Sequence, residues 1–115
     1  MAEVNTAHAG GLDAATRRHI VDIVVGEAHP SRIILFGSRA RGSATAHSDI
    51  DLVVIEPGVV DAYEETVRLG RALAALRIPI DVLVYSEADV LAKGDWLGTA
   101  LRTALREGEL LYAAQ

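Results

Sequence analysis

The sequence has no cysteine and few aromatic residues, which make up 4% of its 115 positions. Without cysteine the chain cannot form a disulfide or a thiolate metal site. No apolar run approaches the roughly 18 residues that a membrane-spanning helix requires, so we expect no membrane partner. The first residues, MAEVNTAHAGG, also lack the basic start and the apolar stretch of a signal peptide. The sequence therefore predicts a cytoplasmic protein.

Positive charge is in deficit as well. The chain carries 16 acidic residues against 11 lysines and arginines, which gives a formal net charge of -5. Proteins that hold nucleic acid over a wide surface do so with many basic side chains that neutralise phosphates. The balance of charge therefore argues against direct nucleic-acid binding. It is compatible with binding of a small triphosphate together with a metal ion.

The length and composition fit a single domain over residues 1–115, of which residues 1–11 are expected to form a flexible N-terminus. Half of the residues are hydrophobic, which is typical of a globular domain. A chain of this size is too short for a core and a separate substrate-recognition domain. We therefore expect the substrate to be small, or to be brought by another molecule.

Hydrophobic periodicity and turn residues divide the chain into helices and short strands. Amphipathic helices are expected over 12–28, 60–77 and 96–106. Ser86 followed by Asp89 is typical of a further helix start. Apolar strands are expected in RIILFG, in DIDLVVIEPG and in IPIDVLVYS, while ELLYA fits either a last strand or an extended tail. This order predicts an α/β fold with a small mixed β-sheet flanked by helices.

Three aspartates interrupt the apolar strands. Asp49 and Asp51 open the second strand, and Asp81 is the one charge in IPIDVLVY. Because side chains alternate along a strand, Asp49 and Asp51 point to the same side, about 6 to 7 Å apart. Each aspartate alone also fits a turn or a solvated strand edge, but together they offer the hard oxygen ligands that magnesium or manganese prefers. Three carboxylates on neighbouring strands can hold two metal ions for phosphoryl or nucleotidyl transfer.

The segment GSRARGSATAHS, between the first two strands, is rich in small and polar residues. Gly37 allows the backbone to approach a ligand closely, and Ser38 offers a hydroxyl and an N–H group to an anion. Gly37 and Gly42 have the spacing of the two P-loop glycines, but the P-loop lysine is missing, so we reject that interpretation. Arg39 and Arg41 are expected either to contact phosphate or a partner, or to be solvated.

The stretch GSRARGSATAHSDIDL, followed by Asp81 in a later strand, resembles the signature of the polymerase-β-type nucleotidyltransferases. It is most similar to their minimal members, the antitoxin half of prokaryotic toxin–antitoxin pairs whose toxin is a HEPN-domain ribonuclease. The resemblance covers nearly the whole chain and implies a nucleotidyltransferase-like fold. It implies that Asp49, Asp51 and Asp81 are catalytic and bind metal, with two Mg²⁺ ions expected and ATP as substrate. The nucleotide-binding residues that it implies are Gly37, Ser38, Arg41 and Ser48.

The resemblance also implies a partner and a reaction. AMP would be transferred from ATP to a hydroxyl, expected to be a tyrosine, of a cognate HEPN-type toxin, which is thereby neutralised. Two alternatives stay open: an antitoxin that acts by binding and occlusion, and a small-molecule nucleotidyltransferase with its acceptor pocket at a homodimer interface. Partner docking is expected around Trp96, Leu97, Leu101 and Leu105, for which burial in the core is the other interpretation.

Overall fold

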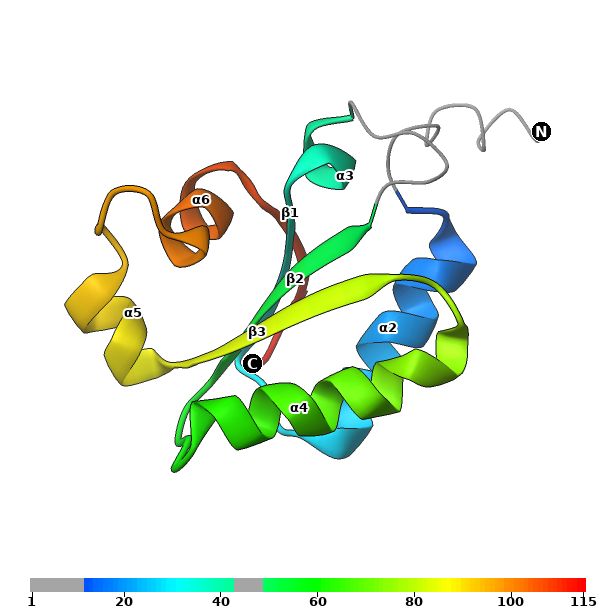
Figure 1. Cartoon of the computed structure of the whole chain (residues 1–115), viewed down its shortest axis with the longest axis horizontal. Coiled ribbons are helices and arrows are strands. Elements are labelled where there is room, and N and C mark those ends of the chain that lie inside the picture. The colour runs from blue at the N-terminus through cyan, green and yellow to red at the C-terminus, as the bar shows by residue number, and fades with distance from the viewer. Residues whose placement is uncertain (1–11, 43–48) are drawn as a thin grey trace.

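The computed structural model describes residues 12–42 and 49–115 (Figure 1). The N-terminus predicted to be flexible, residues 1–11, and the predicted nucleotide ligand Ser48 lie outside the described residues. Within the described part, no helix is long and apolar enough to cross a membrane.

A four-stranded sheet forms the centre of the molecule (Figure 1). Its strands are β1 (Arg32–Phe36), β2 (Ile50–Glu56), β3 (Ile80–Ser86) and β4 (Glu109–Ala113), and their order is β3-β2-β1-β4. β1 pairs antiparallel with β2 and with β4, whereas β2 pairs parallel with β3. Two parallel strands need a crossover connection, which a helix between β2 and β3 supplies. The predicted α/β class with a mixed sheet is confirmed, and ELLYA is a strand.

One face of the sheet carries the larger core. Helices α2 (Ala14–Glu27) and α4 (Ala62–Leu73) cover this face, and α4 continues as a short 3-10 helix, Ala74–Leu76. The buried side chains of the two helices pack on those of β1, β2 and β3. They are Ile20, Val24, Leu69 and Leu73 on the helices, with Ile33, Leu35, Leu52, Val54, Val82 and Val84 on the strands. This packing fixes which residues of β2 and β3 face away from α2 and α4.

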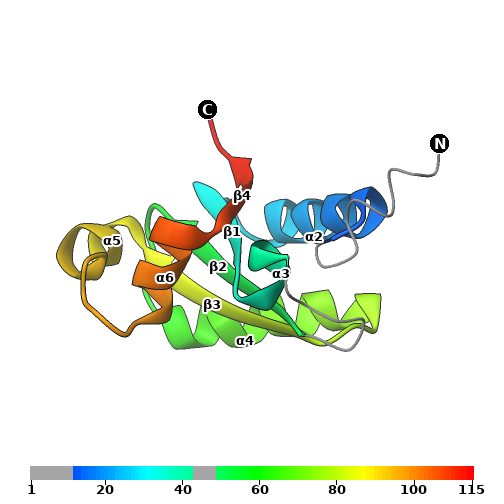
Figure 2. The same ribbon diagram turned by 90° about the horizontal axis from the view of Figure 1, so that it is seen from above.

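The other face of the sheet is covered only in part. Helices α5 (Glu87–Lys93) and α6 (Ala100–Glu107) lie together at one end of the molecule, away from α2 (Figure 2). α6 buries Leu101 and Ala104 against side chains of β1 and β2, and it contacts these two strands. The side chain of Leu83 on β3 therefore stays 40% exposed. This uncovered part of the sheet adjoins the end of β2 and β3 that carries the predicted carboxylates.

The helix predicted to start at Ser86 is confirmed. Ser86 Oγ accepts a hydrogen bond from the backbone N–H of Asp89 (3.0 Å), and Asp89 Oδ2 accepts one from the N–H of Ser86 (3.1 Å). This capping box satisfies two N–H groups that the first turn of α5 would otherwise leave without partners.

The last helix was predicted to start at Trp96, and this is wrong. α6 begins at Ala100, because Thr99 is its N-cap and its Oγ1 accepts a hydrogen bond from the N–H of Arg102 (3.1 Å). Trp96 and Leu97 lie in the preceding turn, with 57% and 79% of their surface exposed. The core interpretation is therefore wrong for these two residues. It is confirmed for Leu101, which is buried, and Leu105 packs at the edge of the same cluster.

Candidate active site

Two of the predicted carboxylates lie at the start of β2. Asp49 is exposed and directly precedes the strand, and Asp51 is half-buried as its second residue. The neighbours Ile50 and Leu52 are buried in the larger core, so they face α2 and α4. Because side chains alternate along a strand, Asp49 and Asp51 face the opposite, partly open side of the sheet.

The third carboxylate lies beside them on the neighbouring strand. In the parallel pairing of β2 with β3, Asp81 is the register partner of Asp51. Val82 is buried in the larger core, which places Asp81 on the same open face as Asp51, and the side chain of Asp81 is exposed. The register thus brings two acidic side chains to adjacent positions at one end of the sheet, where β2 and β3 begin.

The glycine–serine turn follows β1 and lies at the same end of the sheet. Phe36, the last residue of β1, pairs with Asp51, and Gly37 follows it. Gly37 has φ +79° and ψ −157°, a region that side chains of L-residues rarely adopt. A Cβ atom at Gly37 would overlap Oδ2 of Asp51 and lie 3.3 Å from its Cγ. Glycine therefore lets the backbone before Ser38, the first residue of α3 (Ser38–Arg41), touch the Asp51 carboxylate.

The remaining predicted ligands are less fully placed. Arg41 is the last residue of α3, and Ser48 lies outside the described residues. Of the set expected to bind nucleotide, the structure brings Gly37 and Ser38 to the carboxylates. The roles of all of these side chains, including those of the three aspartates, stay predictions.

The carboxylate donors are of the type that magnesium prefers. Among the described residues, no group of three or more histidine, aspartate or glutamate side chains is placed to hold a metal ion by itself. Protein sites for Mg²⁺, however, commonly use one or two carboxylates and complete the coordination with water and substrate phosphates. Asp51 and Asp81 are register partners, and Asp49 lies two residues before Asp51 on the same face, so carboxylates from two strands are available for such a site. We therefore expect metal to bind here together with a triphosphate.

Sequence analysis missed one carboxylate that the structure sets apart. Among the residues that the structure describes, Glu56 is the one buried charged residue, with 7% of its surface exposed. It ends β2 and so lies at the opposite end of the strand from Asp51. Its only signal in the sequence is that a charge closes the apolar run LVVI. Burial and the neighbouring Glu65 raise the pKa of the Glu56 carboxyl to about 7.

The comparison with protein families shows the family of the chain. Residues 17–103 match the nucleotidyltransferase domain family, so the chain belongs to this family and is a nucleotidyltransferase. A candidate protein adenylyltransferase of Methanocaldococcus jannaschii is 38% identical over 82 residues, which are 70% of this chain and 77% of that protein. The family predicted from the motif is confirmed.

Solved structures confirm the fold. The MntA–HepT toxin–antitoxin complex matches with a TM-score of 0.60 at 20% identity, over 90% of this chain and 74% of the other. The MNT antitoxin in complex with a tri-AMPylated HEPN toxin of Shewanella oneidensis gives 0.58 at 19%, over 88% and 72%. A candidate nucleotidyltransferase of Sulfolobus solfataricus gives 0.62 at 22%, over 86% and 78%. At these identities the matches show a shared fold.

Proposed function

We propose that this chain transfers AMP from ATP to a hydroxyl of a protein partner, and that the partner is a HEPN-type toxin which the transfer neutralises. One observation carries the proposal: the Gly37–Ser38 turn touches Asp51, and Asp81 lies in register beside it. Such a turn next to paired carboxylates suits a triphosphate bound with metal. The names of relatives support the acceptor and the nucleotide, since they include a protein adenylyltransferase, an AMPylated toxin complex and a complex with AMP-PNP.

Each of the predicted site residues has a role in the proposed transfer. Asp49, Asp51 and Asp81 would hold two magnesium ions together with the phosphates of ATP. When bound, magnesium neutralises charge on the phosphate oxygens and orients the α-phosphate. Ser38 contacts the terminal phosphates through its hydroxyl and its backbone N–H. Arg41 and Ser48 complete the proposed contacts to the nucleotide.

The proposed reaction is a single displacement at the α-phosphorus. The acceptor oxygen forms a bond to this atom, the bond to the bridging oxygen breaks, and pyrophosphate leaves. Asp81 accepts the proton of the acceptor hydroxyl, because it is exposed on the open side of the pair that it forms with Asp51. The product is an AMP phosphodiester of the acceptor, which for tyrosine places a bulky anion on the side chain.

The exposure of the predicted carboxylates favours a protein acceptor. Asp49 and Asp81 are exposed on the sheet face that α5 and α6 cover only in part. Transfer requires the acceptor oxygen to be held in line with the α-phosphate, and positioning supplies much of the rate. A folded partner that docks over these exposed carboxylates can supply that positioning.

We expect the isolated protein to modify no free hydroxyl compound efficiently. Incubation with ATP and magnesium should label a HEPN-domain partner, while aminoglycosides and simple alcohols at the same concentration stay unmodified. Radiolabel transfer from α-labelled ATP measures both. Rapid labelling of free alcohols by the protein alone would contradict a protein acceptor and favour a pocket between two copies of the chain. Tight partner binding with no label would favour neutralisation by occlusion.

Partner docking is proposed at the turn between α5 and α6. Trp96 and Leu97 are exposed there, and Lys93 Nζ lies 5.7 Å from the centre of the Trp96 ring. α5 and α6 pack on the same sheet face as Asp51 and Asp81. On β3, Leu83 is exposed on that face, two residues beyond Asp81, which corresponds to about 6 to 7 Å. A partner that covers the carboxylates can therefore rest on these apolar side chains.

Leu97→Asp is expected to raise the KM for the protein partner about tenfold, with kcat at saturating partner unchanged. An exposed apolar contact at an interface contributes on this scale, and its loss leaves the carboxylates intact. Steady-state transfer rates at varied partner concentration measure both constants. Val60→Asp is the matched control, because Val60 is fully exposed beyond the opposite end of β2. Equal effects of the two variants would contradict docking at the α5–α6 turn.

A further inference from the structure

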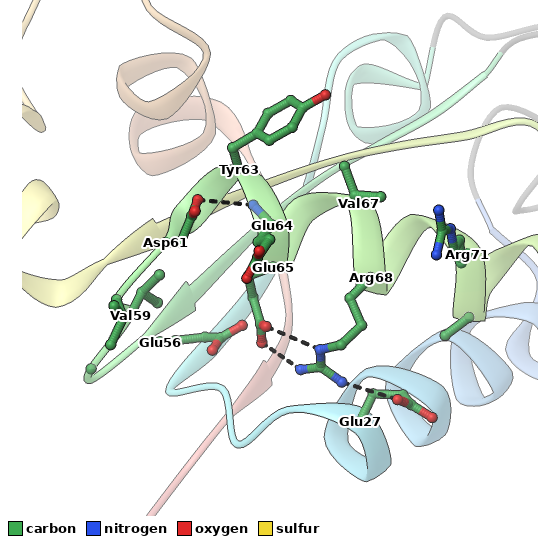
Figure 3. A pocket seen from close by; sticks show the side chains of 13 residues that line it. Glu27, Glu56, Val59, Asp61, Tyr63, Glu64, Glu65, Val67, Arg68 and Arg71 are labelled. Atoms are coloured by element: carbon green, nitrogen blue, oxygen red, sulfur yellow. Dashed lines mark hydrogen bonds and ion pairs between the residues drawn. The ribbon is translucent and has the colours of Figure 1, made fainter.

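The groove around Glu56 lies outside the proposed active site. It has a volume of about 1010 Å³ and lies where β2 ends and α4 begins, with α2 on its far side (Figure 3). Five of its lining residues are acidic and two are basic. The acidic ones are Glu27, Glu56, Asp61, Glu64 and Glu65, and the basic ones are Arg68 and Arg71.

Most of the charge between α4 and α2 is already paired. Glu65 accepts two hydrogen bonds from Arg68, at 2.6 Å and 3.1 Å, and Arg68 Nη1 donates a third to Glu27 Oε1 at 3.0 Å. These three side chains form a bridge from α4 to α2, as Figure 3 shows. The bridge therefore leaves Arg68 with little capacity to neutralise a further carboxylate.

Glu56 is different from the residues of this bridge. Its side chain lies beside that of Glu65 (Figure 3), and its Oε2 atom is buried and has no hydrogen-bond partner. A buried acceptor without a partner costs free energy, and burial beside a second carboxyl raises the pKa of Glu56 to about 7, so that it is partly protonated at neutral pH. A cation that replaces this proton would pair with the ionised Glu56 carboxylate and offset the cost of its burial. Asp61 and Glu64 at the groove's rim add negative potential that favours such a cation.

We propose that this groove binds an organic cation, an ammonium or guanidinium group on a flexible chain, which pairs with Glu56. The open groove is far larger than an ion and admits a substituted cation. Such a group can come from a free polyamine or from a lysine or arginine of a bound peptide. The site is separate from the proposed transfer reaction.

The groups around Glu56 set the pH dependence of this site. Glu65 and Arg68 face it from α4, and Glu27 from α2 is held against Arg68. Burial and Glu65 raise the pKa of Glu56 to about 7, so the carboxyl is mostly protonated below that pH. Cation binding favours the ionised form and must displace the proton. Binding is therefore expected to be tighter at pH 8 than at pH 6, and to release protons near pH 7.

Isothermal titration of the full chain with spermidine, and separately with a short acetylated peptide of alternating leucine and arginine, tests this proposal. Binding of either probe supports it, and the probe that binds identifies the source of the cation. Titration at neutral pH in buffers of different ionisation enthalpy measures the protons released. Glu56→Gln should weaken binding at least about tenfold and abolish proton release, as expected for the loss of a charged hydrogen-bond partner.

Glu107→Gln is the matched control, because it removes one exposed carboxylate on α6, away from the groove. It should change the affinity less than about twofold. Glu64→Gln, an exposed groove residue whose loss leaves the fold intact, should weaken binding about threefold even if Glu56→Gln does not fold. The proposal is overturned if neither probe binds, if Glu107→Gln weakens binding as much as the groove variants, or if binding releases no proton.

Discussion

Replacement of Asp51 by asparagine is expected to lower AMP transfer at least ~10²-fold while the protein stays folded. Asparagine keeps the shape of the side chain but removes the negative charge that the proposed metal site needs. Asp51 is half-buried on the partly open face of the sheet, and a side chain of the same shape keeps its packing. We therefore expect the free energy of unfolding to change by less than about 1 kcal/mol.

Initial rates of transfer and urea unfolding, measured on the same preparation, separate the two effects. Asp22→Asn is the control, since Asp22 is an exposed carboxylate on α2, on the other face of the sheet. It should leave the transfer rate unchanged. A normal rate in the Asp51→Asn protein would show that Asp51 is not a metal ligand in the reaction.

Gly37→Ala should damage both the site and the fold. The added Cβ would overlap Asp51 Oδ2, and the backbone at φ +79° is strained for any residue that has a side chain. We expect a loss of about 1–3 kcal/mol in the free energy of unfolding, from the strain and from displacement of the carboxylate. Because Asp51 must move, transfer should fall about 10²-fold, since small errors in position reduce rates on this scale.

Gly26→Ala is the control for this substitution. Gly26 lies inside α2, and a Cβ there would meet nothing within 4 Å, so alanine should leave stability unchanged or raise it by up to about 1 kcal/mol. Thermal unfolding and transfer rates measure both variants. If Gly37→Ala keeps full activity and stability, the close approach of the turn to Asp51 has no part in function.

Much of this architecture could be predicted because local patterns and tertiary packing agree. Alternation placed Asp49 and Asp51 on one side of their strand, and the run IPIDVLVY placed Asp81 alone in an apolar strand. That Asp51 and Asp81 are register partners could not be predicted, because the register depends on how α4 carries the chain from β2 back to β3. The sequence therefore predicted which carboxylates form the candidate site but not how they pair.

Two features escaped prediction for different physical reasons. The apolar spacing around Trp96 resembled the start of a helix, but Thr99 caps α6 three residues later and leaves Trp96 exposed in a turn. Glu56 looked like an ordinary charge at a strand end. It is buried because α4 and α2 close over the end of β2, and burial of this kind depends on contacts far apart in the sequence.

Intact-mass spectrometry of the HEPN-domain partner, after incubation with this chain, ATP and magnesium, tests the proposed function most directly. The partner should gain the mass of one or more AMP groups, and fragment spectra should place them on a hydroxyl side chain. With the Asp51→Asn chain the same partner should stay unmodified while still forming a complex. A partner that is neutralised by the wild-type chain without any gain in mass would contradict the account.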